Sequence, residues 1–196
     1  MYTVDKLYKY ELIVKNSRFI TLIYKVNSVN DVMEFINKCR QEYSNATHYC
    51  YAYKILDYKK ADDDGEPSGT AGMPILNVID SNNLTNIIIV VIRYFGGIKL
   101  GANGLIRAYT KAAANIIKEA NLVELSLGYN ITITFDYNLT KEIDYLLKNI
   151  KINSKEFSDK VIYNIDIPKL FLENINNNHI EYVINKEILI QKEVNQ

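Results

Sequence analysis

The chain has 196 residues, of which 48% are apolar and 23% are charged. This composition is typical of a globular protein, and it excludes wholesale disorder and a collagen-like fibre. Because 23 basic residues balance 23 acidic ones, any nucleic-acid role must rest on a local basic patch and not on a global positive field.

The first 125 residues predict a mixture of strands and helices. Apolar residues at helical spacing indicate the helices, and the apolar run at 86–93 is typical of a central strand buried on both faces. The predicted strands are Tyr8–Val14, Arg18–Val26, Thr47–Leu56, Ile75–Ile79 and Asn86–Arg93, and the predicted helices are Asp31–Tyr43 and Asn103–Ala120.

The pattern changes beyond Gly128, which we interpret as marking a boundary. The following elements are predicted in the order βαββαβ, a ferredoxin-like arrangement. We therefore predict an α+β protein with two domains, 1–125 and 126–196. The elements of the second domain are strands at 131–137, 152–157, 161–167 and 180–191, and helices at 141–149 and 168–176.

Cysteine usage and apolar runs bear on the compartment. Cys39 and Cys50 are too few to form a disulfide framework, which favours a reducing environment. The N-terminal sequence does not resemble a signal peptide, and the longest apolar stretch, 87–92, is far shorter than the roughly 20 residues of a membrane span. We expect a soluble, cytoplasmic protein without a membrane partner.

The glycines are concentrated in two loops. Seven of the eight lie between positions 65 and 104, in the segments DDDGEPSGTAGMP and RYFGGIKLGANG. Glycine permits a positive φ and a close approach of backbone to a ligand, although tight turns between strands need it too. Because loops on a rigid scaffold often carry function, we interpret both as candidate functional loops.

The second loop lies between a predicted buried strand and a predicted helix. The N-terminus of a helix presents unpaired N–H groups and partial positive charge, which suits an anion. Basic side chains flank the loop, but its glycine spacing matches neither the dinucleotide fingerprint nor the Walker loop. Either it is a structural connection or it holds a phosphate-type ligand, free or in RNA. The candidate contacts are Arg93, Gly96, Gly97, Lys99, Gly101, Asn103, Gly104 and Arg107.

The acidic run in the first loop, 62–66, does not fit the register of an EF-hand. A magnesium site remains an alternative, but we favour a solvated turn or carboxylates that cap backbone N–H groups. We assign no metal ligand and no cofactor. The residues predicted to shape the same site are His48, Asp63, Asp64, Glu66, Ser68 and Thr70.

The predicted strand at 47–56 carries two further patterns. His48 and Cys50 share a face and suggest a nucleophile with its base, but no third residue to orient the histidine is apparent, so we favour a buried structural pair. Tyr49, Tyr51 and Tyr53 alternate with them. An aromatic face can stack on bases, although such a face is more often part of a core.

Three segments together resemble the YigZ/IMPACT family. They are ATHYCYAYKI at 46–55, DDGEPSGTAGMPIL at 63–76 and VIRYFGGIKLGANGLIRAYTKAA at 91–113. The resemblance implies a first domain with the two-layer α/β fold of a small-subunit ribosomal protein and of elongation factor G domain IV. The second domain is expected to resemble elongation factor G domain V.

The resemblance also implies a role in translation. Eukaryotic members block activation of a starvation kinase, an activity that requires an additional domain, so that partner is not carried over. Our leading hypothesis is a non-enzymatic, RNA- or ribosome-associated regulator of translation. Two alternatives stay open: an enzyme that binds a phosphorylated small molecule, with Mg²⁺ on the acidic run, and a protein-interaction module that docks a partner in translation control on the C-terminal sheet.

Overall fold

The computed structural model describes residues 1–178 and 180–191. The chain divides into two compact units, Met1–Val123 (unit 1) and Glu124–Gln196 (unit 2). The boundary expected from the sequence, between residues 125 and 126, lies close to this division, and the assignment of 1–125 and 126–196 as two domains stays a prediction.

Unit 1 is built on a five-stranded antiparallel sheet with the strand order β2-β3-β6-β4-β5. The strands of this sheet are β2 (Tyr8–Val14), β3 (Ser17–Lys25), β4 (His48–Ile55), β5 (Tyr58–Asp62) and β6 (Ile87–Tyr94), and the short strand β1 (Tyr2–Val4) lies outside it. Its helices are α1 (Val29–Glu42), α2 (Gly72–Ser81) and α3 (Ala102–Glu119).

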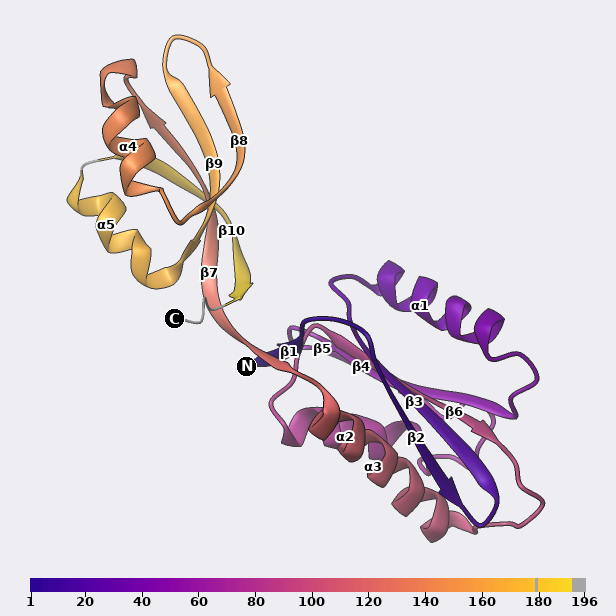
Figure 1. Ribbon diagram of the computed structural model, residues 1–196. Helices are drawn as coiled ribbons and strands as arrows, with labels where there is room; N and C mark the ends of the chain where they lie inside the picture. The colour runs from indigo at the N-terminus through magenta and orange to yellow at the C-terminus, as the bar shows by residue number, and fades with distance from the viewer. Residues whose placement is uncertain (179, 192–196) are drawn as a thin grey trace. The chain divides into compact units, whose positions relative to one another are not determined.

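Helices cover both faces of this sheet (Figure 1). The central strand β6 requires this arrangement, because it presents apolar side chains on both faces of the sheet and both faces must be buried. Ile87, Ile89 and Val91 belong to the core beneath α2 and α3, whereas the alternate residues at 88, 90 and 92 belong to the core beneath α1. Unit 1 therefore has three layers, and the prediction of two layers was wrong on this point, although the α+β class is confirmed.

The aromatic face of β4 is part of the core. Tyr49, Tyr51 and Tyr53 are buried in the cluster that contains Val32 and Ile36 of α1. Because α1 covers these rings, they are not available to stack on the bases of a bound nucleic acid.

One predicted strand is a helix. Residues 75–79 lie in α2, where apolar side chains at helical spacing face the core, and Pro74 lies in the first turn, where a missing N–H is tolerated. The β-branched residues of this segment favour a strand locally, but packing in the core decides for a helix. The sequence interpretation also missed the short strands β1 and β5.

Unit 2 has the element order βαββαβ, as the sequence predicts. Its strands are β7 (Leu122–Phe135, which begins in unit 1), β8 (Lys151–Phe157), β9 (Val161–Pro168) and β10 (Glu181–Gln191), antiparallel in the order β10-β7-β9-β8. Its helices are α4 (Thr140–Leu146) and α5 (Leu172–Asn177), preceded by the 3₁₀ turns Tyr137–Leu139 and Lys169–Phe171. Both helices lie on one side of the sheet (Figure 1). Of the helices in the described residues, none is long and apolar enough to cross a membrane.

Gly128 lies inside β7 and not in a linker, which corrects its interpretation as a boundary. It pairs with Ile188 on β10 and with Pro168 on β9. A Cβ at this position would collide with the carbonyl oxygen of Ile167 and with the side chain of Ile190. The absence of a side chain at Gly128 therefore allows β9 and β10 to lie close to β7 within the sheet.

Substitution of Gly128 tests whether the close contact between β7 and its neighbouring strands requires a glycine. We expect Gly128→Ala to lower the free energy of unfolding of unit 2 by about 1–3 kcal/mol, because the backbone of β9 must shift to admit the methyl group. Urea denaturation followed by circular dichroism measures the effect, with Ser126→Ala on the same strand as the control. Equal stability of the two variants would show that the strands tolerate the extra atom.

Candidate functional site

A buried ion pair joins the two glycine loops. Arg93, at the end of β6, donates from one terminal nitrogen to Oε1 of Glu66 at 2.6 Å. The Arg93 and Glu66 residues are only 5% and 8% exposed. The Tyr109 hydroxyl of α3 donates to the same carboxylate oxygen at 2.8 Å. A single carboxylate thus connects the first loop, the central strand and the long helix.

The rest of the Arg93 side chain is enclosed. Its other terminal nitrogen donates to Ser17 Oγ at 3.3 Å, and its guanidinium lies 5.4 Å and 5.6 Å from the ring centres of Phe19 and Phe95. Arg93 Nε is buried and has no hydrogen-bond partner among the residues that the structure describes. A charge held in this way is not free to bind a phosphate in solvent, so the assignment of Arg93 as a phosphate contact needs correction.

Asp63 organises the first glycine loop. Its carboxylate accepts hydrogen bonds from the backbone N–H groups of Gly69, Ala71 and Gly72 at 2.7–2.9 Å. Burial raises the pKa of Asp63, but these three hydrogen bonds outweigh burial and leave the pKa below its ordinary value. Since α2 begins at Gly72 and Ala71 has no side chain that can cap it, Asp63 caps this helix from a distance.

Asp64 and His48 extend the same arrangement. The Asp64 carboxylate accepts from the Tyr49 N–H and from Arg40 of α1, both at 2.6 Å. His48 Nδ1 lies 2.8 Å from the Asp64 carbonyl oxygen, and its Nε2 lies 3.9 Å from Oε2 of Glu66. The histidine therefore bridges the backbone of the first loop and the buried carboxylate.

Cys50 is enclosed beside these groups and has no nucleophilic character. Its thiol donates to the Asp63 carbonyl oxygen at 3.0 Å and lies 3.3 Å from the Tyr109 hydroxyl. Burial raises the pKa of the Cys50 thiol well above its ordinary value, so it stays protonated. The geometry favours the structural interpretation of the His48–Cys50 pair.

The second glycine loop is held against the β2–β3 turn. A Cβ on Gly96 would collide with the backbone of Asn16, and the Gly96 N–H donates to Ser17 Oγ at 3.2 Å. Gly97 and Gly101 adopt positive φ values of 82° and 71°, a conformation that favours glycine. The loop is thus a fixed structure that ends where α3 begins, with Asn103 and Gly104 already in the first turn of the helix.

The exposed cations form a separate surface. We call it the loop–helix surface: the Phe95–Gly101 loop together with Asn103, Arg107 and Lys111 on α3. Residues four apart lie on one side of a helix, and these three are exposed, as is Lys99 in the loop. Phe95 and Ile98 add apolar side chains that are 47% and 46% exposed.

The predicted site residues therefore fall into two groups. One forms the framework that holds the loops, which we call the buried cluster: Arg93, Glu66 and Thr70 are buried, and Asp63, Asp64 and His48 are half-buried. Gly97, Lys99, Gly101, Asn103 and Arg107 lie exposed on the loop–helix surface, whereas Ser68 is exposed on the first loop and Gly96 and Gly104 are half-buried. Sequence reasoning missed Ser17, Arg40, Tyr109 and Lys111. Of these, only Lys111 had a local signal, its spacing of four from Arg107.

The buried ion pair predicts a stability effect. We expect Arg93→Ala to lower the free energy of unfolding by about 3–5 kcal/mol, because Glu66 would keep its charge without a cation. Urea denaturation at neutral pH measures the loss. Arg107→Ala, an exposed arginine in the same sequence motif, is the control and should stay within about 0.5 kcal/mol of the wild type. An unchanged midpoint for Arg93→Ala would contradict this role.

The Asp63 cap predicts a dependence on pH. Its lowered pKa means that the stabilisation is complete above the ordinary value of 3.8 and is lost as the pH falls through the lower folded value. We expect Asp63→Asn to be less stable than the wild type by about 1–2 kcal/mol at neutral pH, with a difference that narrows below pH 3.8. Thermal unfolding across pH gives the comparison, and Asp57→Asn, at an exposed turn, is the control. A difference that stays constant with pH would argue against the carboxylate as the cap.

Comparison with known proteins identifies relatives of this chain. The Impact N-terminal domain family matches residues 15–117. The IMPACT family member YvyE of Bacillus subtilis is 42% identical over 159 residues, which cover 76% of this chain and 73% of that protein. The IMPACT family member YigZ of Escherichia coli is 30% identical over 165 residues, 79% of each chain.

A solved structure extends the similarity to the fold of both units. A protein described as hypothetical has a crystal structure that matches with a TM-score of 0.73 and 25% identity, and the match covers 94% of this chain and 97% of that one. Together with the family match over residues 15–117 and the identities to bacterial members, this similarity leads to one conclusion. The chain belongs to the IMPACT family.

Proposed function

We propose that this protein binds RNA through the loop–helix surface and regulates translation in association with the ribosome. The observation that carries the proposal is the exposed set of unpaired cations on that surface. Lys99, Arg107 and Lys111 are exposed, and no ion pair to any of them occurs within the described chain. Between Asp80 and Glu119 the sequence has no acidic residue, so this stretch of the chain carries only positive charges although the whole chain is neutral.

Phosphate binding fits the chemistry of this surface. Cations without an internal partner release counterions when they meet a phosphate backbone, and this release supplies most of the affinity for nucleic acid. The exposed Phe95 ring offers a face on which an unpaired base can stack. Glycines in the loop let backbone N–H groups come close to a phosphate. The translational role itself is what the resemblance to eukaryotic family members implies.

The buried cluster supports this use of the loops by holding them in place. A preformed loop loses little conformational freedom on binding, which favours affinity. The acidic run is engaged within the protein: Asp63 accepts three backbone N–H groups, and Glu66 accepts from Arg93 and Tyr109. This engagement favours RNA binding over the alternative in which the run holds Mg²⁺ for a phosphorylated small molecule.

A salt series tests the proposal. We expect a fluorescein-labelled single-stranded RNA to bind the wild type with an affinity that falls steeply as salt rises, because phosphate contacts release counterions. The variant Lys99→Ala/Arg107→Ala/Lys111→Ala should bind more weakly and lower the slope of log affinity against log salt by about 2 to 3. Fluorescence anisotropy gives both quantities, and co-sedimentation with purified ribosomes tests the ribosomal target.

The control removes the same charge elsewhere in unit 1. Lys6→Ala/Lys38→Ala/Lys60→Ala alters three other exposed lysines and should leave the slope close to that of the wild type. Equal slopes for the two triple variants would locate the binding away from the loop–helix surface. Absence of binding at low salt would refute the RNA proposal and favour a screen of phosphorylated metabolites with Mg²⁺.

A further inference from the structure

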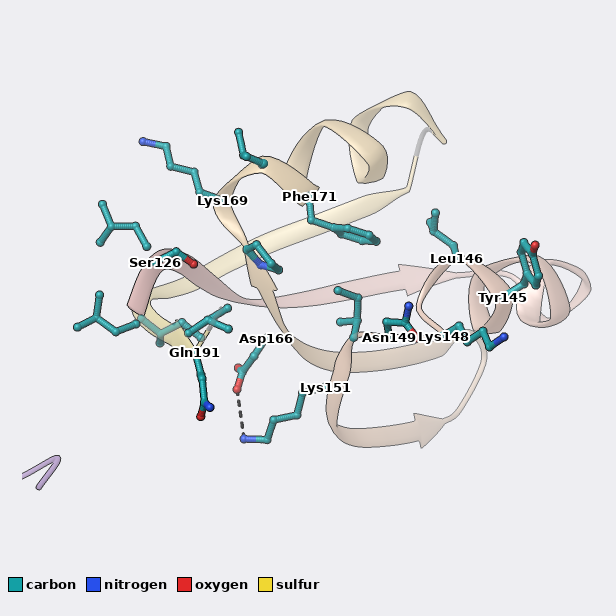
Figure 2. A pocket seen from close by; sticks show the side chains of 17 residues that line it. Ser126, Tyr145, Leu146, Lys148, Asn149, Lys151, Asp166, Lys169, Phe171 and Gln191 are labelled. Carbon is teal, nitrogen blue, oxygen red and sulfur yellow. Dashed lines mark hydrogen bonds and ion pairs between the residues drawn. The ribbon is translucent and has the colours of Figure 1, made fainter. Parts of the chain in front are cut away.

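Unit 2 contains a groove that the proposed function does not use. It has a volume of about 920 Å³ and is lined only by residues of unit 2. Figure 2 shows the lining side chains, which come from the end of α4, the turn before α5, the β8–β9 region and the paired strands β7 and β10. The volume is within the range of about 300–1,000 Å³ that is usual for ligand sites.

The walls of this groove are apolar and project into solvent. Tyr145, at the end of α4, is 82% exposed, and Leu170, in the turn before α5, is 83% exposed. Leu127 on β7 is 50% exposed, and Phe171 and Ile188 contribute further apolar surface. Large apolar side chains gathered at a concave site mark a binding surface.

The charge of the groove is positive. Lys148, Lys151 and Lys169 line it, and Asp166 is the acidic lining residue, so three cations against one anion leave a net charge of +2. The Asp166 carboxylate is satisfied within the protein, because it accepts from Asn130 at 2.7 Å and from Asn153 at 2.8 Å and lies 3.4 Å from Lys151 Nζ. Lys148 and Lys169 are exposed, and neither has an ion-pair partner among the described residues.

Beyond Asp166 and Lys151, which line the groove, the sheet face opposite α4 and α5 offers few unpaired groups for a partner to bind. Four asparagines on that face bond to one another: Asn130 and Asn153 donate to Asn164, and Asn164 and Asn185 donate to Asn130, at 2.8–3.1 Å. Amide groups that are already paired gain little from a new partner. The groove, with its unpaired cations and exposed apolar walls, is therefore the better docking surface of unit 2.

We propose that this groove binds an acidic, amphipathic segment of a partner protein. The apolar side chains of the segment would lie against Tyr145, Leu170 and Leu127, and its carboxylates would pair with Lys148 and Lys169. A small ligand inside the groove would leave the projecting Tyr145 and Leu170 largely uncovered, whereas a peptide would cover them. The phosphate backbone of a nucleic acid would pair with the lysines but would not use the apolar walls.

A synthetic peptide tests this proposal on the full chain. The probe is a fluorescein-labelled peptide with leucines at helical spacing on one side and glutamates on the other, and its binding is measured by fluorescence anisotropy. We expect saturable binding that is lost when serines replace the leucines or lysines replace the glutamates. Binding of all three peptides with equal affinity would overturn the proposal.

Variants in unit 2 locate the binding. We expect Lys148→Glu/Lys169→Glu to weaken the acidic peptide at least about tenfold, as removal of interface anchors does, and Leu170→Ser to weaken it as well. The matched controls are Lys141→Glu/Lys186→Glu and Val183→Ser, which alter exposed residues outside the groove. Circular dichroism confirms that each variant is folded. Equal effects of the groove variants and their controls would overturn the proposal.

A second probe separates a protein partner from nucleic acid. A single-stranded RNA oligonucleotide is added as a competitor to the wild type and to Lys99→Ala/Arg107→Ala/Lys111→Ala. If RNA displaces the peptide from both proteins and the groove variants bind RNA more weakly, the groove binds RNA. That result would refute the proposal that the groove binds an acidic protein segment. Peptide binding that persists in the triple variant supports the groove whether or not RNA binds the loop–helix surface.

Discussion

The ion pair between Arg93 and Glu66 is the interaction on which the arrangement of unit 1 depends. Both residues are almost fully buried, and a buried charge is very unfavourable unless it is paired and hydrogen-bonded. Arg93 is the penultimate residue of the central strand, Glu66 lies in the first glycine loop, and Tyr109 brings α3 to the same carboxylate. The loops can therefore adopt only those conformations that keep these charges together, and this requirement orders segments that are distant in the sequence.

The residues around the two glycine loops fall into two groups, the buried cluster that supports the loops and the exposed loop–helix surface. The glycine loops are supported by Asp63, Asp64 and Glu66 through hydrogen bonds to backbone N–H groups and to arginines. The residues above them, from Phe95 to Lys111, leave their cations unpaired. The acidic run thus has a structural role within the protein. The basic side chains of the loop–helix surface keep their positive charge and can present it to a ligand.

Unit 2 likewise has polar side chains that are paired with one another and others that remain unpaired. Asparagines on one sheet face satisfy one another, and the groove on the unit retains exposed apolar walls and unpaired lysines. The loop–helix surface and the groove are both basic, but they differ in shape and in apolar content. An exposed basic surface with one aromatic ring suits a phosphate backbone, whereas a groove with exposed apolar walls and unpaired lysines suits an acidic, amphipathic protein segment.

The sequence by itself determined the helices and strands with strong periodicity, the two glycine loops, the βαββαβ order and the family, because these depend on residues close together in the chain or on long motifs. Only the tertiary structure decided that residues 75–79 form a helix, that helices cover both faces of the first sheet, and that Gly128 lies within a strand. It also decided which cations are free. Arg93 and Arg107 belong to one sequence motif. Glu66 pairs with Arg93, whereas Arg107 is exposed and has no ion-pair partner among the described residues. Local patterns cannot distinguish them, because the pairing of a charge depends on contacts between residues far apart in the chain.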